Sequence, residues 1–267
     1  MLQYGFFINA IIGVILLSIA SAVIGTYIVT RRLVSISGGV THACFGGLGL
    51  GYFLGVSPVA MAAVFAVASS LGVQWMSARR RVREDSAIAV IWALGMAIGT
   101  LFIFLTPGYV PELNSFLFGS ILTISTSDLC IFGAFTALVI IIMACWFNRI
   151  VICAFDPDFA RIRRIPVTLV TTVMTVLVAV CIVLTIRLVG VMLLMSMLAL
   201  PQMTAELFTG RFSSIMWLSV FLSLVCSLGG LFLALVIPVP VSALIVLTMT
   251  AVYLVARVAR AVSMAVR

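Results

Sequence analysis

The sequence predicts an all-α protein, a polytopic bundle of about eight to nine transmembrane helices that forms a single membrane domain over residues 1–267. Hydrophobic residues make up 64% of the chain and charged residues 8%, against roughly 45–50% and 25% in an ordinary soluble domain. Apolar runs of about 20 residues, enough to cross a bilayer core, recur along the whole chain. Backbone groups in lipid must be paired within their own segment, and no alternating barrel pattern is present, so these runs are expected to be helices.

Charges and proline or glycine residues separate the apolar runs from one another. The candidate spans that result are 5–29, 33–55, 58–77, 86–106, 127–147, 166–186, 188–208, 213–236 and 241–257. The first run contains Ala20-Ser21-Ala22, which is similar to a signal cleavage site. No basic residue precedes this run and Arg31-Arg32 follows it, so we expect a retained helix. The run 188–208 is the candidate for a re-entrant segment if the number of crossings is eight.

The arginine residues predict the orientation of the bundle, because cytoplasmic loops collect positive charge. With the N-terminus outside, all 15 basic residues except Arg187 face the cytoplasm. The connection 148–165, predicted to be a cytoplasmic segment, contains Asp156 directly before Pro157, a pattern typical of a helix start. A short amphipathic helix is therefore expected from Pro157 to about Arg164, and its charged face needs water or a soluble partner.

Two absences limit the chemistry of the chain. The sequence contains no lysine, so it has no P-loop of the form G-x-x-x-x-G-K-[ST] and no site of that kind for ATP. His42 is the single histidine, which excludes H-E-x-x-H zinc sites. No enzymatic activity is expected. The glycines Gly47, Gly51 and Gly55 recur at every fourth residue and predict close packing of a helix face against a neighbour.

Four stretches, in order, resemble the permeases of the zinc, manganese and iron ABC importers, the ABC-3 group. They are Arg31 to Ala43 (RRLVSISGGVTHA), Glu84 to Val90 (EDSAIAV), Phe155 to Ala160 (FDPDFA) and Val189 to Pro201 (VGVMLLMSMLALP). The family patterns are R-R-x-V-x-x-x-D-x-x-S-H-A, E-D-x-A-I-G-I, F-D-x-x-x-A and V-G-x-L-L-x-x-x-x-x-x-P. Many relatives carry Asp four residues before the histidine, whereas this chain has Gly38, so the identity of the ion is left open.

The resemblance implies the membrane-spanning subunit of an ATP-driven divalent metal importer in the bacterial cytoplasmic (inner) membrane. It further implies separate cytoplasmic ATPase subunits, a second permease subunit, as a homodimer or a heterodimer, and an extracytoplasmic metal-binding protein. Membrane lipid surrounds the chain, and no nucleic acid is expected as a partner. No cofactor is expected to be bound permanently, since the metal ion is cargo. The segment that would couple to the ATPase is made of Phe155, Asp156, Pro157, Asp158, Phe159 and Ala160.

His42 is the predicted metal ligand on the transport path, because its imidazole is the only nitrogen ligand in the chain suited to a borderline transition metal. Gly38 and Gly46, one turn away on either side, leave room for an ion. Ser37 and Thr41 would add weak oxygen contacts, and a two-fold axis would bring two His42 rings together. The alternative is that His42 only packs between helices.

A gradient-driven secondary transporter or a channel is the alternative function. Such proteins keep ionisable residues at mid-membrane, where each charge is costly. All seven acidic residues of this chain fall at the ends of predicted spans or in loops. Their placement disfavours proton or sodium coupling. A structural or assembly factor of the membrane is the third candidate.

Overall fold

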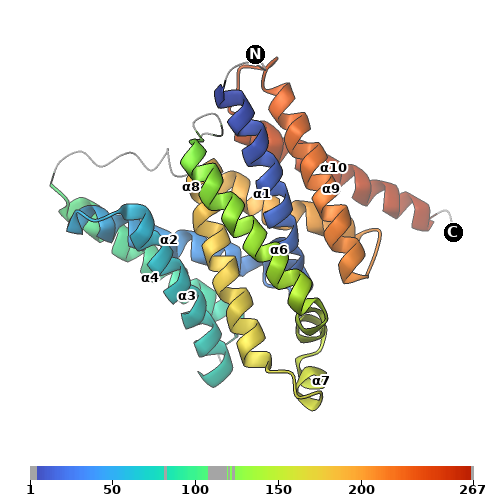
Figure 1. Ribbon diagram of the computed structural model, residues 1–267, viewed down its shortest axis with the longest axis horizontal. Coiled ribbons are helices and arrows are strands. Elements are labelled where there is room, and N and C mark those ends of the chain that lie inside the picture. Colours follow the sequence, from blue (N-terminus) through green and yellow to red (C-terminus); the bar gives the residue numbers. More distant parts are fainter. Residues whose placement is uncertain (1–4, 81–82, 108–118, 120, 122–123, 266–267) are drawn as a thin grey trace. The chain divides into compact units, whose positions relative to one another are not determined.

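A computed structural model describes residues 5–80, 83–107, 119, 121 and 124–265 of the chain. Within these ranges the secondary structure is helical and contains no strand, which confirms the all-α prediction. The helices, shown in Figure 1, are α1 (Gly5–Thr30), α2 (Val34–Leu54), α3 (Pro58–Arg80), α4 (Glu84–Leu105), α6 (Thr126–Phe155), α7 (Pro157–Ile162), α8 (Val167–Glu206), α9 (Phe212–Leu233) and α10 (Val241–Ala265).

Seven of the described helices are long and apolar enough to cross a membrane, namely α1, α3, α4, α6, α8, α9 and α10. Helix α2 has 21 residues but is not among them, since six glycines and His42 lower its mean hydropathy. Helix α8 has 40 residues, and a straight helix of that length would be about 60 Å long, twice the bilayer core. Two of the predicted spans are therefore parts of this one element.

The break within α8 lies at Gly190, whose φ of 81° and ψ of 172° are not helical. A side chain at this φ is strained, which explains why glycine stands there. The two predicted spans 166–186 and 188–208 correspond to the two parts of α8, and the sequence placed their boundary at Arg187, three residues too early. The part after Gly190 is about 24 Å long, which is short for a full crossing.

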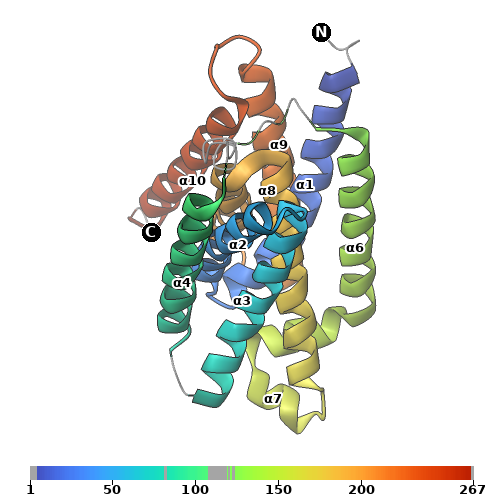
Figure 2. The ribbon, with the colours of Figure 1, turned by 90° about the vertical axis from the view of Figure 1, so that its left-hand side faces the viewer.

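The described residues group into two compact units, each built from discontinuous stretches. Unit 1 contains residues 1–32, 114–147 and 188–267, and unit 2 contains residues 33–113 and 148–187. In unit 1, α9 packs against both α1 and α10, and in unit 2, α2 packs against both α3 and α4 (Figure 2). The single domain over residues 1–267 stays a prediction.

Pro201 and Gln202 join α8 to α1 inside unit 1. Pro201 has no N–H, so the carbonyl of Met197 loses its helical donor. The side-chain Nε2 of Gln202 replaces this donor at 3.2 Å from Met197 O and also donates to Ser21 O of α1 at 3.1 Å. A Cβ at Gly25 would collide with this amide. The helix therefore continues through the proline, and its freed carbonyl is paired by a side chain.

Glycines set the distance between α2 and its two neighbours in unit 2. A Cβ at Gly47 or Gly51 would collide with the backbone of α3, and a Cβ at Gly46 or Gly49 would collide with that of α4. The predicted packing role is thus confirmed for Gly47 and Gly51. It is wrong for Gly55, which ends α2 in the left-handed region with φ of 67° and has open space around it. Gly55 is the helix C-cap.

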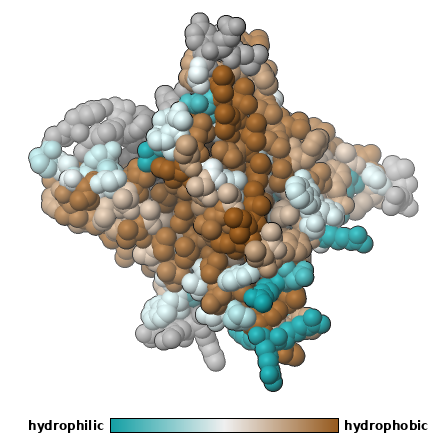
Figure 3. Space-filling view, viewed as in Figure 1, coloured by the Kyte–Doolittle hydropathy of each residue, from teal (hydrophilic) through white to brown (hydrophobic). Residues whose placement is uncertain are grey.

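The face of the molecule seen in Figure 3 is mainly hydrophobic, as expected for helices that meet lipid. Hydrophilic side chains gather on that face over α7. Exposed apolar side chains are common on the spanning helices, for example Leu101 and Phe104 of α4, Trp217 and Phe221 of α9 and Leu247 of α10. Helix α7 differs from these helices in being only six residues long and largely surrounded by charge.

Candidate functional site

His42 lies half-buried near the middle of α2, where its imidazole stacks on the indole of Trp92 from α4. The ring centroids are 4.5 Å apart and the planes differ by 3°. The residues that the structure describes offer no hydrogen bond to the imidazole nitrogens. A metal ion binds to a ring nitrogen in the plane of the imidazole, so the stacked indole covers one face of the ring and not its ligating edge.

Ser37 and Thr41 do not share the surroundings of the imidazole. Both side chains are buried, and their hydroxyls donate within α2, from Ser37 Oγ to Val34 O at 2.7 Å and from Thr41 Oγ1 to Ser37 O at 2.6 Å. They lie one turn apart on one face, and His42 projects about 100° away from Thr41 around the helix. The predicted oxygen support for His42 is therefore not assembled within a single chain, because helix geometry turns these side chains away from it.

Within the described parts of the chain, no three His, Cys, Asp or Glu side chains come together as a set that could hold a metal ion. Gly38, one turn before His42, is buried and supplies no ligand. Gly46, one turn after His42, lies against Gly95 O and the ring of Phe65. The imidazole is thus an isolated candidate ligand on a glycine-rich helix, and a single nitrogen suits passing contact more than permanent binding.

Two acids at the start of α4 tie this helix to both of its neighbours. Asp85 accepts a hydrogen bond from Ser35 of α2 at 3.0 Å, and Glu84 accepts one from Ser77 of α3 at 3.5 Å. Both acids lie in the first turn of α4, where the helix dipole favours negative charge. The Glu84-Asp85 pair therefore has a structural role, because it fixes the end of α4 that leads to Trp92.

Trp92 is the site residue that sequence reasoning missed. It precedes Gly95 by three residues and Gly99 by seven, so all three lie on one face of α4. A Cβ at Gly95 would collide with Ala43 of α2, and one at Gly99 would collide with Phe45. The close approach at these glycines brings the indole onto His42. The Trp-x-x-Gly-x-x-x-Gly spacing was a readable signal for a face of α4 that packs on a partner helix.

Helix α7 starts as the sequence predicted and ends earlier. The Asp156 carboxylate accepts from the backbone N–H of Asp158 at 3.1 Å and of Phe159 at 2.9 Å, and Pro157 occupies the first turn. The last helical residue is Ile162 and not Arg164. Arg164 adopts a left-handed φ of 56°, and Ile165 N donates to Ala160 O at 3.0 Å. This Schellman-type arrangement stops the helix two residues before the predicted end.

The exposed surface around α7 combines apolar and charged side chains. Phe155 is 55% exposed, Phe159 42% and Ile162 79%, whereas Ala160 is fully buried. Phe155 is the last residue of α6 and Phe159 lies in α7, so the two rings belong to different helices. Asp158 forms an ion pair with Arg161 at 2.8 Å. The guanidinium of Arg163 lies 5.1 Å from the centroid of the Phe159 ring.

Long apolar helices, a helix rich in glycine that packs on two of them and a short exposed helix between two spans are typical of a membrane-spanning transport subunit. The chain belongs to the ABC 3 transport family, whose model matches residues 3–260. It is a permease subunit and a multi-pass protein of the bacterial inner membrane.

Relatives in several bacteria carry names from metal transport. A probable metal transport system membrane protein of Chlamydia pneumoniae is 39% identical over 238 residues, which cover 87% of this chain and 81% of the relative. The manganese transport system membrane protein MntC of Halalkalibacterium halodurans is 28% identical, with 92% and 85% covered. A solved structure described as PsaBC from Streptococcus pneumoniae in complex with Fab has a TM-score of 0.83 and 25% identity, with 96% and 92% covered.

Proposed function

We propose that this chain provides the translocation path of an ATP-driven importer for a divalent metal ion, manganese, iron or zinc. The observation that carries the proposal is the family match over residues 3–260, together with relatives that are named as metal and manganese transport membrane proteins. The metal is cargo in this proposal, and the chain holds no cofactor of its own.

The free energy for transport would come from ATP hydrolysis by a separate ATPase subunit. The full sequence contains no lysine and hence no P-loop. Every acid in the described part of the chain lies near the end of a long helix or at the start of α7, and a buried mid-membrane acid is the usual means of coupling to protons or sodium. These facts favour an ATP-driven subunit over the gradient-driven transporter that is the alternative.

Helix α7 and its flanks would receive the ATPase. The coupling segment Phe155 to Ala160 contains the N-cap Asp156 and the exposed rings of Phe155 and Phe159. An exposed ring fits an apolar pocket of a soluble partner, while the surrounding charges fix its orientation. Helix α7 is capped by Asp156 and Pro157 at its start and ended by the left-handed Arg164. Because both ends are fixed, α7 would transmit a movement of the ATPase to α6 and α8.

His42 would contact the ion as it passes. The stack on Trp92 fixes the plane of the imidazole without covering its nitrogen edge. One nitrogen ligand per chain binds weakly, so a second permease subunit, as a homodimer, would bring a second His42 to the path. An extracytoplasmic metal-binding protein would deliver the ion to this pair of subunits.

Uptake into proteoliposomes tests the proposed function. The permease is reconstituted with the ATPase subunit of its importer, and ATP is enclosed on the ATPase side. Labelled manganese, iron or zinc is offered together with the binding protein. Uptake that requires ATP and stops with a hydrolysis-deficient ATPase supports the proposal. Uptake driven by a proton or sodium gradient without ATP contradicts it and supports the secondary transporter.

A further inference from the structure

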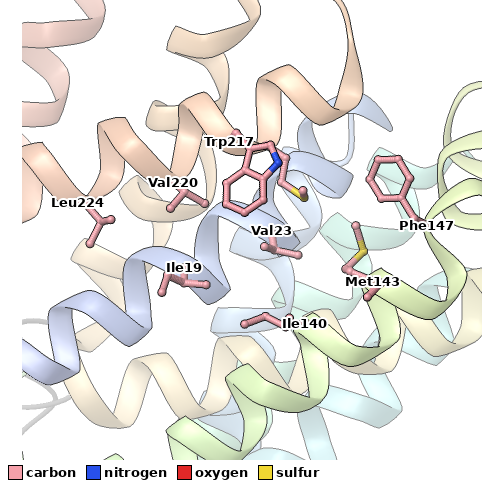
Figure 4. A pocket seen from close by; sticks show the side chains of 10 residues that line it. Ile19, Val23, Ile140, Met143, Phe147, Trp217, Val220 and Leu224 are labelled. Carbon is pink, nitrogen blue, oxygen red and sulfur yellow. The ribbon is translucent and has the colours of Figure 1, made fainter.

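An open crevice in unit 1 is lined by apolar side chains from three spanning helices. Its volume is about 530 Å³. Figure 4 shows side chains of α1, α6 and α9 converging on it, among them Ile19, Val23, Met143, Phe147, Trp217 and Val220. Among the lining side chains only the Trp217 indole carries a hydrogen-bond donor. The crevice can thus hold hydrocarbon, and it offers almost nothing to an ion.

The size and the walls of the crevice suit an apolar chain. Binding sites for small molecules occupy roughly 300–1,000 Å³, and an apolar cavity excludes water. Trp217 is 67% exposed although it lines the crevice, so the site opens toward the surroundings of unit 1. These surroundings are the bilayer, because α1, α6 and α9 are all spanning helices. Lipid hydrocarbon is therefore the material that reaches the crevice.

The residues of α9 change from charged to apolar along the axis of the helix, from its start toward the crevice. Arg211 precedes the helix and is exposed, Trp217 follows about 9 Å further along the axis, and Leu224 lies about 10 Å deeper still. Trp217, Val220 and Leu224 share one face of α9 at intervals of three and four residues. Arginine at the phosphate level and tryptophan just below it is the order in which a helix enters a bilayer from the headgroup side.

The start of α9 can also accept negative charge. Arg211 makes no side-chain hydrogen bond to the first turn, and Ser213 and Ser214 are exposed there. The first N–H groups of a helix have no partner within the helix, and together with a guanidinium they attract an anionic oxygen. This charge lies at the end of α9 from which the apolar wall begins.

We propose that the crevice binds one acyl chain of an anionic phospholipid, whose phosphate is held at the start of α9 by Arg211. The acyl chain lies between Val23, Met143 and Val220, and the glycerol region lies beside the indole of Trp217. The bound lipid fills the space between α1, α6 and α9 and supports their packing.

Native mass spectrometry of the full-length chain in detergent tests this site. The delipidated protein is titrated with dioleoyl phosphatidylglycerol, with dioleoyl phosphatidylcholine and with oleic acid. We expect one tightly bound phosphatidylglycerol. Val220→Trp fills the crevice and should weaken binding at least about tenfold. Arg211→Gln should weaken phosphatidylglycerol about fivefold and leave phosphatidylcholine unchanged.

The matched control is Phe221→Trp, which adds bulk to the neighbouring exposed position outside the crevice. This variant should bind phosphatidylglycerol as the parent does. Equal binding by Val220→Trp and Phe221→Trp contradicts the site. A shift from dimer to monomer in Val220→Trp alone shows that a second copy fills the crevice, and oleic acid that binds as tightly as phosphatidylglycerol shows a fatty-acid site. Either result overturns the proposal.

Discussion

The side-chain amide of Gln202 in α8 donates to the backbone oxygen of Ser21 in α1 across 3.1 Å. The same nitrogen donates to Met197 O, the carbonyl that Pro201 leaves without a helical partner. A proline in the interior of a helix and a glutamine directly after it thus act together. One side chain pairs the carbonyl freed by the proline and links two spanning helices.

Gln202→Leu should destabilise the permease by about 1–3 kcal/mol. The substitution keeps the size of the side chain and removes the donor, so Met197 O stays buried and unpaired and Ser21 O loses a donor beyond its helical one. The expected result is a lower melting temperature of the purified protein in detergent. Met203→Leu on the next position is the control and should melt as the parent does. Equal melting of both variants would show that these hydrogen bonds contribute nothing.

Gly49→Ala should separate α2 from α4. A Cβ at Gly49 would collide with the carbonyl oxygen of Gly99, and backbone cannot rotate aside as a side chain can. A cost of about 1–3 kcal/mol follows from overpacking. Thermal unfolding of the purified protein measures it. Gly72→Ala in α3 is the matched control, because its Cβ would meet only Ile91 Cδ1 at an ordinary 3.7 Å. Similar losses in both variants would contradict the close α2–α4 contact.

His42→Leu should abolish metal uptake and leave the amount of inserted complex unchanged. Trp92→Leu should act more mildly, because it frees the imidazole to rotate without removing the ligand. A stack is worth about 0.5–1.5 kcal/mol, so the metal concentration at half-maximal uptake should rise about two- to tenfold. Phe104→Leu, on an exposed position of the same helix, is the control. Normal uptake by His42→Leu would leave this histidine as a packing residue.

Phe159→Asp should abolish uptake by releasing the ATPase. The substitution puts a charge where an exposed ring is expected to enter an apolar pocket of the partner. Co-purification of the ATPase and labelled metal uptake are both measured. Arg161→Gln removes only an exposed ion pair with Asp158 and should affect neither. Full uptake by Phe159→Asp would show that α7 is an ordinary solvated connection.

The predicted orientation can be checked with single cysteines in a chain that lacks its six native ones. Ser77→Cys and Asp158→Cys should resist an impermeant thiol reagent that is applied outside the cell. Arg187→Cys, at the one basic position predicted to face outward, should react. Labelling of Ser77→Cys and Asp158→Cys together with protection of Arg187→Cys would contradict the predicted orientation and indicate the opposite one.

The helices could be predicted from the sequence because lipid leaves an apolar run little choice of backbone structure. Pro201 does not end α8, because the side chain of Gln202 pairs the carbonyl that the proline frees, and hydropathy alone does not indicate this pairing. The start of α7 was readable because Asp156 and Pro157 act locally, whereas its end depends on Arg164 adopting a left-handed backbone. The stack of Trp92 on His42 could not be predicted, because the spacing from Trp92 to Gly99 indicates that this face of α4 packs on a helix and does not say that the helix is α2.

The glycines of α2 affect how this helix enters the bilayer during synthesis. A helix that falls below its neighbours in hydropathy, and whose glycines expose its backbone, gains little from lipid alone during synthesis. Helices α3 and α4 follow it directly and cover its glycine faces. A ribosome-bound chain that ends before α3 should therefore fail to retain α2 in the bilayer, and a chain that extends through α4 should retain it as part of a three-helix unit.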